Sequence, residues 1–152
     1  MLTRLLAVFC SLFFVVACAN TPRGDTAAEL ANVAPGSQMD LEVNVGDRVF
    51  FDFDSSTLSA DAQATLDRQA TWLKNYPSMN VMVEGHCDPR GTREYNLALG
   101  ERRANAVKDY LVNAGVDVFR IKTVSFGKER LAVEGNTEEA YHQDRRGVTV
   151  LN

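Results

Sequence analysis

Residues 83–111 read VEGHCDPRGTREYNLALGERRANAVKDYL and divide into an apolar start, a loop rich in Gly and Pro, and a long helical stretch. Small or apolar residues in the last part recur at steps of three and four, as on one face of an α-helix; they are Leu97, Gly100, Ala104, Val107 and Leu111. Gly115 suits the end of this helix because glycine readily adopts a left-handed conformation. We therefore expect a strand over 79–84, a loop over 85–92 and then a helix.

The segments outside this stretch extend the pattern into an α+β domain. Ser59 is a typical N-cap residue, and helical spacing continues from it to Tyr76, where Pro77 predicts the end of the helix. Alternation of apolar and polar residues predicts strands elsewhere. The remaining expected elements are strands over 41–45, 49–53, 121–126 and 148–151 and a short helix over 138–141. Strands that alternate with helices indicate one mixed sheet with helices against one face.

Composition limits the classes of function. The chain has 152 residues, with 16 Lys and Arg against 20 Asp and Glu, and its formal charge is −4. Acidic and basic residues are interleaved, whereas a nucleic-acid binder usually gathers its cations into a stripe. A hydrophobic content of 45% is typical of a globular protein. The sequence therefore predicts one folded domain and no nucleic-acid partner.

The N-terminus has the pattern of a signal peptide. Arg4 precedes an uncharged apolar run over 5–17, which is too short to cross the roughly 30 Å hydrocarbon core of a membrane as a helix. The sequence VVAC over 15–18 resembles a bacterial lipobox, which implies cleavage before Cys18 and acylation of that residue with chains such as palmitate. Plain secretion is the alternative.

Three segments follow from this interpretation. Residues 1–17 are the expected lipoprotein signal peptide, residues 18–40 the lipidated Cys18 with a flexible tether, and residues 41–152 the folded domain. Ala19 follows the cysteine, where Asp would resemble an inner-membrane retention signal, so we expect a lipid anchor in the outer membrane of a Gram-negative bacterium, on its periplasmic face. Cys87 is then the one free thiol of the mature chain, which excludes an intramolecular disulfide.

Asp88 and Arg103 form the most informative pair of charges. A carboxylate after a strand and a guanidinium in the following helix can converge on one zwitterionic ligand. Asp88 would accept a hydrogen bond from an ammonium group, and Arg103 would hold a carboxylate with its planar fork. A structural salt bridge is the alternative interpretation of this pair. On the first interpretation, replacing either residue by Ala should remove ligand binding and leave the fold intact.

Three stretches carry a resemblance to a known family. They are residues 51–77, residues 83–111, and the segments VSFGKE over 124–129 and DRRGVTV over 144–150. Over 49–151 the chain resembles the OmpA-like peptidoglycan-binding domain, and most of all the lipoproteins that work with the Tol proteins of the cell envelope. The resemblance implies a βαβα-type two-layer sandwich with a mixed four-stranded sheet. It also implies a protein that binds the peptide stem of peptidoglycan at meso-diaminopimelate without cutting it, is not an enzyme, needs no cofactor, and has TolB and other Tol proteins as partners.

The same resemblance assigns roles to single residues. It implies that Asp88 takes the ammonium group of diaminopimelate and that Arg103 holds its carboxylate. Asn96 is expected to order the loop, and Arg90 to offer a further cation. The full expected pocket is Asp88, Arg103, Phe53, Asp54, Thr92, Tyr95, Leu99 and Arg90.

Two positions depart from the family pattern. Cys87 stands where Thr or Ala is usual, and Asp144 stands where Asn precedes a pair of arginines. That pair, Arg145 and Arg146, has either a structural or a glycan-contacting role. The negative charge of Asp144 should weaken any contact that the pair makes with an anion.

The same residues fit other chemistries less well. His86, Cys87 and Asp88 are all metal-ligand types, but consecutive residues at a strand end point to alternate sides, so we expect no metal site. Cys87 is expected to be a small buried apolar residue instead of a nucleophile. Carboxylate pairs for glycan hydrolysis lack an evident cleft. A mainly protein-binding adaptor in the periplasm remains the alternative to a wall-binding protein.

Overall fold

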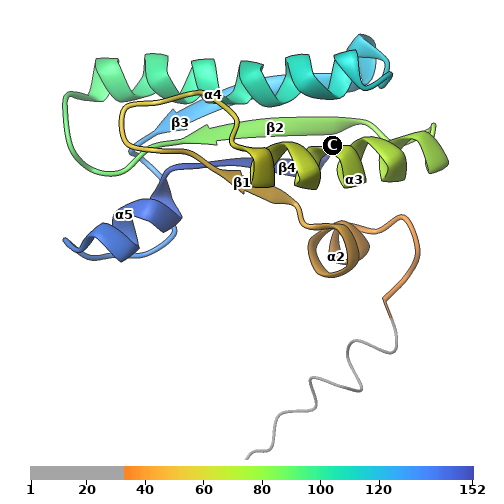
Figure 1. Cartoon of the computed structure of the whole chain (residues 1–152), viewed down its shortest axis with the longest axis horizontal. Helices are drawn as coiled ribbons and strands as arrows, with labels where there is room; N and C mark the ends of the chain where they lie inside the picture. The colour runs from red at the N-terminus through yellow and green to blue at the C-terminus, as the bar shows by residue number, and fades with distance from the viewer. Residues whose placement is uncertain (1–32) are drawn as a thin grey trace, which may run out of the picture.

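The computed structural model describes residues 33–152 and contains a mixed four-stranded sheet (Figure 1). The predicted signal peptide, Cys18 and most of the predicted tether lie outside the described residues. The order in the sheet is β1-β4-β2-β3, in which β2 and β3 are parallel and the other two pairs are antiparallel. The strands are β1 (Arg48–Phe50), β2 (Val81–His86), β3 (Ile121–Gly127) and β4 (Arg146–Leu151).

Helices α3 (Ala60–Asn75) and α4 (Arg93–Asn113) lie side by side over one face of this sheet (Figure 1). The predicted N-cap of α3 is confirmed, since Ser59 Oγ accepts a hydrogen bond from the backbone N–H of Ala62 at 3.2 Å. Thr92 caps α4 in the same way. The shorter helices are η2 (Val118–Arg120) and α5 (Glu138–Asp144). The predicted α+β class and two-layer arrangement are therefore confirmed.

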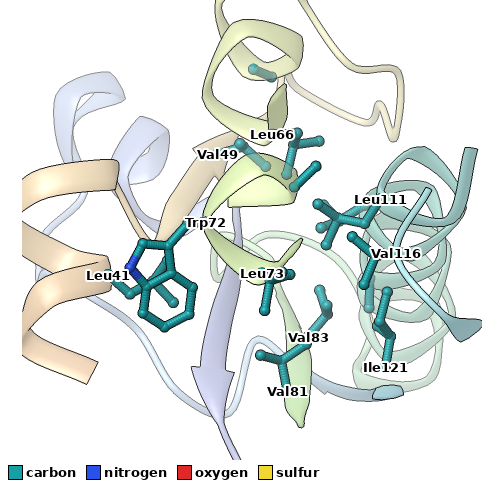
Figure 2. Packing of buried hydrophobic residues seen from close by; sticks show 14 of the residues in the cluster. Leu41, Val49, Leu66, Trp72, Leu73, Val81, Val83, Leu111, Val116 and Ile121 are labelled. Atoms are coloured by element: carbon teal, nitrogen blue, oxygen red, sulfur yellow. The ribbon is translucent and has the colours of Figure 1, made fainter. Parts of the chain in front are cut away.

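The core lies between the two long helices and the sheet (Figure 2). Leu66 and Leu73 of α3, together with Leu111 of α4, are fully buried. They meet the inward-facing side chains of the strands, among them Val81 and Val83 of β2. Burial of these apolar surfaces holds α4 over β2, and the loop that joins the two is thereby fixed in place.

The predicted strand over 41–45 is wrong. Helix α2 (Gln38–Asp40) runs into one π-helical turn, η1 (Leu41–Val45), which ends where Gly46 takes a φ of 94°. Ser37 Oγ caps α2 by accepting from the N–H of Asp40 at 3.1 Å. The helical turn places Leu41 in the core, beside Trp72 in Figure 2, and leaves Val43 exposed. The alternation of apolar and polar residues over 41–45 fits this turn equally well, because Leu41 and Val45 are four residues apart and so share a helical face.

Helix α2 begins within the range 18–40 that the sequence predicts as a tether. Gln38 is tied to the other end of the chain, since its Oε1 accepts a hydrogen bond from the N–H of Leu151 at 2.8 Å.

The remaining elements differ from the prediction mainly at their ends. Strand β1 stops at Phe50, so Phe53 lies in a turn and not in the predicted strand over 49–53. The chain turns there because the carbonyl of Asp52 accepts from the N–H of Ser55 at 3.3 Å. Strand β2 lies two residues later than predicted. None of the helices in the described part has the length and apolar content needed to cross a membrane.

Candidate functional site

Three chain segments meet beyond the C-terminal end of β2. The first is the loop 87–92, which joins β2 to α4. The second is the turn over 51–55 that follows β1, and the third is the junction between α5 and β4. The N–H of Phe51 donates to the carbonyl of Arg145 at 2.8 Å, and the Arg145 Nε returns a bond to the Phe51 carbonyl at 3.0 Å. The sheet therefore brings distant parts of the sequence to one place.

A cavity of about 160 Å³ opens between these segments. It combines aromatic and apolar walls with charged groups, as ligand sites commonly do. The cavity is lined by Phe53, Asp54, Cys87, Asp88, Arg90, Gly91, Tyr95, Asn96, Leu99 and Arg103.

Asp88 is buried at the inner end of the loop and is bound by two guanidinium groups. Its Oδ2 lies 2.6 Å from Arg90 Nη2 and 3.4 Å from Arg145 Nη1, and its Oδ1 accepts from Arg90 Nε at 3.2 Å. Burial by itself would raise the pKa of Asp88, but the hydrogen bonds and charge of Arg90, with Arg145, outweigh burial and lower this pKa below its ordinary value. The side chain is therefore a carboxylate at neutral pH.

Arg103 is fully buried in the wall of the cavity. Its Nε donates to the Ser55 carbonyl at 2.8 Å, its Nη1 to the His86 carbonyl at 2.8 Å and its Nη2 to the Asp52 carbonyl at 3.0 Å. Burial lowers the pKa of Arg103. A guanidinium group has five N–H donors, so one N–H on each terminal nitrogen is left over from these three bonds. Arg103 thus ties α4 to the turn over 51–55 and to the end of β2, and it keeps two donors.

The rim of the cavity is aromatic. Phe53 and Tyr95 both expose large parts of their side chains, 61% and 46% of the respective residues. The Tyr95 hydroxyl donates to Asp54 Oδ1, and this bond raises the pKa of Tyr95. Asp54 has a φ of 52°, a left-handed conformation that costs a non-glycine residue about 1 kcal/mol or more. The contact with Tyr95 helps to hold this strained turn at the cavity.

Asn96 and Gly91 fix the conformation of the loop 87–92. Asn96 Nδ2 donates to the carbonyls of Arg90 at 2.7 Å and Thr92 at 3.0 Å. Gly91 takes a φ of 90°, which its lack of a β-carbon permits. Cys87 donates through Sγ to the Asn96 carbonyl at 3.4 Å, and burial raises the pKa of this thiol. Cys87 is therefore a packing residue in thiol form.

The paired arginines before β4 have different surroundings. Arg145 reaches Asp88 and also contacts Glu138 Oε1 at 2.8 Å. Arg146 instead donates to backbone carbonyls of Asp144 and Arg130, each at 3.3 Å. Asp144 Oδ1 accepts from the N–H groups of Ala132 and Val133 and so holds the preceding loop. Within residues 33–152, no three His, Cys, Asp or Glu side chains are grouped closely enough to hold a metal ion.

Residues 50–145 match the model of the OmpA family. The chain belongs to the OmpA family. A peptidoglycan-associated lipoprotein of Brucella melitensis is 50% identical over 152 residues, which covers 97% of this chain and 90% of that protein. A protein of the same description from Rhizobium meliloti is 59% identical over 117 residues, covering 77% and 66% of the two chains.

Solved structures agree with this OmpA-family assignment. The crystal structure of the peptidoglycan-associated lipoprotein from Burkholderia pseudomallei is similar with a TM-score of 0.68 at 40% identity, over 70% of this chain and 90% of that one. The C-terminal domain of Helicobacter pylori MotB has a TM-score of 0.65 at 19% identity, over 70% and 84% of the two chains, and shares the fold. The predicted family resemblance is thus confirmed.

Most residues expected at the site of this OmpA-family domain do line the cavity; the exception is Thr92, which serves as the N-cap of α4. Gly91 lines the cavity although the sequence prediction left it out. Tyr141 and Glu138 were also missed, and both lie beside Arg90. A glycine next to a charged loop residue was the available signal for Gly91, whereas no local pattern indicates the two α5 residues.

Proposed function

We propose that this chain is a lipoprotein that binds peptidoglycan without covalent attachment and tethers the outer membrane to the cell wall. The bound group is the meso-diaminopimelate of the peptide stem, and the site is the cavity around Asp88. The observation that carries the proposal is a buried carboxylate and guanidinium donors in the walls of one small cavity. The names of the relatives, each a peptidoglycan-associated lipoprotein, support it.

The free end of diaminopimelate matches the charges of this cavity. That end bears an ammonium group and a carboxylate on one carbon. In this proposal Asp88 accepts from the ammonium group, and the two N–H groups that Arg103 leaves unused donate to the carboxylate, helped by the exposed Arg90. Charge-assisted hydrogen bonds of this kind contribute about 1.5 to 3 kcal/mol each. Phe53, Tyr95 and Leu99 surround the aliphatic part of the ligand, and Asp54 fixes Tyr95.

The remainder of the chain supplies the anchor. Residues 1–17 are proposed as a signal peptide, Cys18 as the acylated residue, the segment between Cys18 and α2 as the tether, and the chain from α2 onward as the wall-binding domain. More than one acyl chain is needed for a durable anchor, because a single chain binds a membrane only marginally. The protein is placed on the periplasmic face of the outer membrane and within the Tol-Pal system, which acts in cell division and envelope integrity.

A titration tests the wall-binding proposal. The chain from Ala19 onward is titrated by calorimetry with a stem peptide that ends in meso-diaminopimelate, and with the lysine peptide, which lacks the terminal carboxylate. Saturable binding of the first peptide, weak binding of the second and loss of binding in Asp88→Asn are expected. The Asn variant keeps the shape of the side chain, and Asp109→Asn, on the exposed side of α4, is the matched control. Equal binding of both peptides would contradict the proposal.

A protein-binding role at the same rim is the second candidate. The exposed aromatic rings of Phe53 and Tyr95 favour it, since aromatic side chains are enriched at protein interfaces. We propose the periplasmic protein TolB as the partner, with further Tol proteins as candidates. Capture of purified TolB by the immobilised chain, unchanged in Asp88→Asn, would separate this surface from the ligand pocket. Loss of capture in Phe53→Ser would place the partner on the rim.

A further inference from the structure

Arg90 already occupies the position of a cationic ligand at Asp88. Two of its guanidinium nitrogens bind the two carboxylate oxygens, Nη2 to Oδ2 at 2.6 Å and Nε to Oδ1 at 3.2 Å. The Asp88 carboxylate has few accepting positions left, because Arg145 Nη1 lies 3.4 Å from Oδ2 and the Arg90 N–H lies 3.2 Å from Oδ1. An incoming ammonium group must therefore compete with Arg90.

The surroundings of Arg90 allow its guanidinium group to leave Asp88 without losing all of its contacts. The group lies between two aromatic rings, 4.3 Å from the centroid of Phe53 and 4.3 Å from that of Tyr141. Glu138 Oε2 lies 3.7 Å from Arg90 Nη1 and offers a second anion. The Arg90 side chain is 38% exposed, in contrast to the buried Arg103 and Arg145. Arg90 is thus the cation of this cluster with the most freedom to move.

We propose that Arg90 determines the specificity of the site by exchanging partners. When the ligand ammonium group takes Asp88, the Arg90 guanidinium turns to the ligand's own carboxylate, which lies on the same carbon. This inference rests on the proposed function, because it assumes that the cavity binds a zwitterionic end group. If Arg90 turns to the ligand carboxylate, the site requires that carboxylate even without its contact to Arg103.

The exchange penalises ligands that carry only an ammonium group. Such a ligand removes Asp88 from Arg90 and returns no anion. Glu138 cannot fully replace Asp88, because it is shared with Arg145 at 2.8 Å and its side chain is 62% exposed, where ion pairs contribute little. Such a ligand therefore breaks the two bonds between Arg90 and Asp88 and offers Arg90 no bond in return, which opposes binding. A lysine-type or amidated stem therefore meets competition from Arg90 that a zwitterionic stem offsets.

Selectivity measured in two variants tests the exchange. Arg90→Gln removes the competing charge, and Arg93→Gln removes an exposed charge that pairs with Glu129 outside the cavity. The wild type and both variants, each from Ala19 onward, are titrated with three stem peptides: one ending in meso-diaminopimelate, one with its terminal carboxylate amidated, and one ending in lysine. Circular dichroism and the thermal midpoint confirm that the variants are folded.

The expected result is a change in the ratio of the affinities for the three peptides. In Arg90→Gln, the preference for diaminopimelate over its amide and over lysine falls by about tenfold or more, in part because the two weaker peptides bind more tightly. Arg93→Gln keeps the wild-type ratio. An unchanged ratio in Arg90→Gln with retained diaminopimelate binding would overturn the exchange and leave the proposed function standing. Loss of all three peptides in Arg90→Gln would also overturn it, whereas failure of the wild type to bind diaminopimelate would overturn both proposals.

Discussion

Gly85 of β2 and Gly100 of α4 touch through their backbones. A β-carbon built on Gly85 would lie 1.8 Å from the carbonyl oxygen of Gly100, far inside van der Waals contact. The helix can approach the strand this closely only because neither residue carries a side chain. The contact sets the depth of α4 and hence the position of Arg103, which lies one turn further along.

Gly85→Ala should therefore destabilise the domain and remove ligand binding, although it changes none of the residues that line the cavity. The added methyl group meets backbone, which cannot rotate away, so we expect a loss of about 3 kcal/mol or more in the free energy of unfolding. Urea unfolding measures this loss. Gly135→Ala is the control, since residue 135 is exposed and its added carbon meets only the Ala140 side chain at 3.3 Å. Equal stability of the two variants would contradict the prediction.

Replacing Arg103 should cost stability as well as binding. The sequence alone suggests that Arg103→Ala leaves the fold intact, but three backbone carbonyls depend on this side chain. The bond to the His86 carbonyl is buried and the other two are partly buried, and a buried acceptor left without a donor costs about 1 to 3 kcal/mol. We expect a loss of about 3 kcal/mol or more, measured by urea unfolding, against almost no change in Arg102→Ala on the exposed side of α4. A stable Arg103→Ala that fails to bind ligand would assign Arg103 to binding alone.

Stability should depend on pH through Asp88. The folded-state pKa lies below the ordinary value of 3.8, so the ionised carboxylate stabilises the folded state above the unfolded-state pKa, and this contribution disappears as pH falls through the folded-state pKa. The difference in unfolding free energy between wild type and Asp88→Asn should be constant between about pH 5 and 7, and should shrink below about pH 4. Urea titrations at several pH values measure it. A stability difference that grows as the pH falls would contradict a lowered pKa of Asp88 in the folded state.

Trp72 should report on the N-terminal helix. It is the single tryptophan of the chain, and its Nε1 donates to Asp40 Oδ2 at 2.9 Å. Asp40 also accepts from the Gly36 N–H at 2.8 Å. This one carboxylate therefore connects the start of α2 to Trp72 of α3. Asp40→Ala should loosen α2, admit water to the indole and shift its fluorescence to longer wavelength. Glu42→Ala, an exposed change on the next turn, should leave the spectrum unchanged.

The elements that the sequence predicts well are those with a long periodic pattern and a cap. Helix α4 shows steps of three and four over several turns, and Ser59 marks the start of α3. The error over 41–45 has a clear cause. Five residues are too few to separate a strand from a helical turn, and Leu41 and Val45, four apart, both reach the core in the turn. The capping by Ser37 and the bond between Asp40 and Trp72 decide the outcome.

Some residues of the candidate site can likewise be assigned from the sequence, and others cannot. Asp88, Arg90 and Tyr95 lie within one continuous motif, so a resemblance can assign them. Arg145 is 57 positions from Asp88 in the chain and contacts it only because β4 returns beside β1. The sandwich of Arg90 between Phe53 and Tyr141 also needs the three-dimensional arrangement. The charges that we propose to contact the ligand can be assigned from the sequence, but the competition among them cannot.

The position of β4 has a consequence for how the chain folds. β4 is the last of the four strands in the sequence, yet it lies between β1 and β2 and pairs with both. Strand β1 therefore has no partner in the sheet until the final residues are available. A chain whose residues 146–151 are still inside a ribosome lacks this inner strand, and it can complete the sheet only after they emerge. Removal of residues 146–152 would leave β1 without a partner and only β2 and β3 paired with each other, so this sheet could not form.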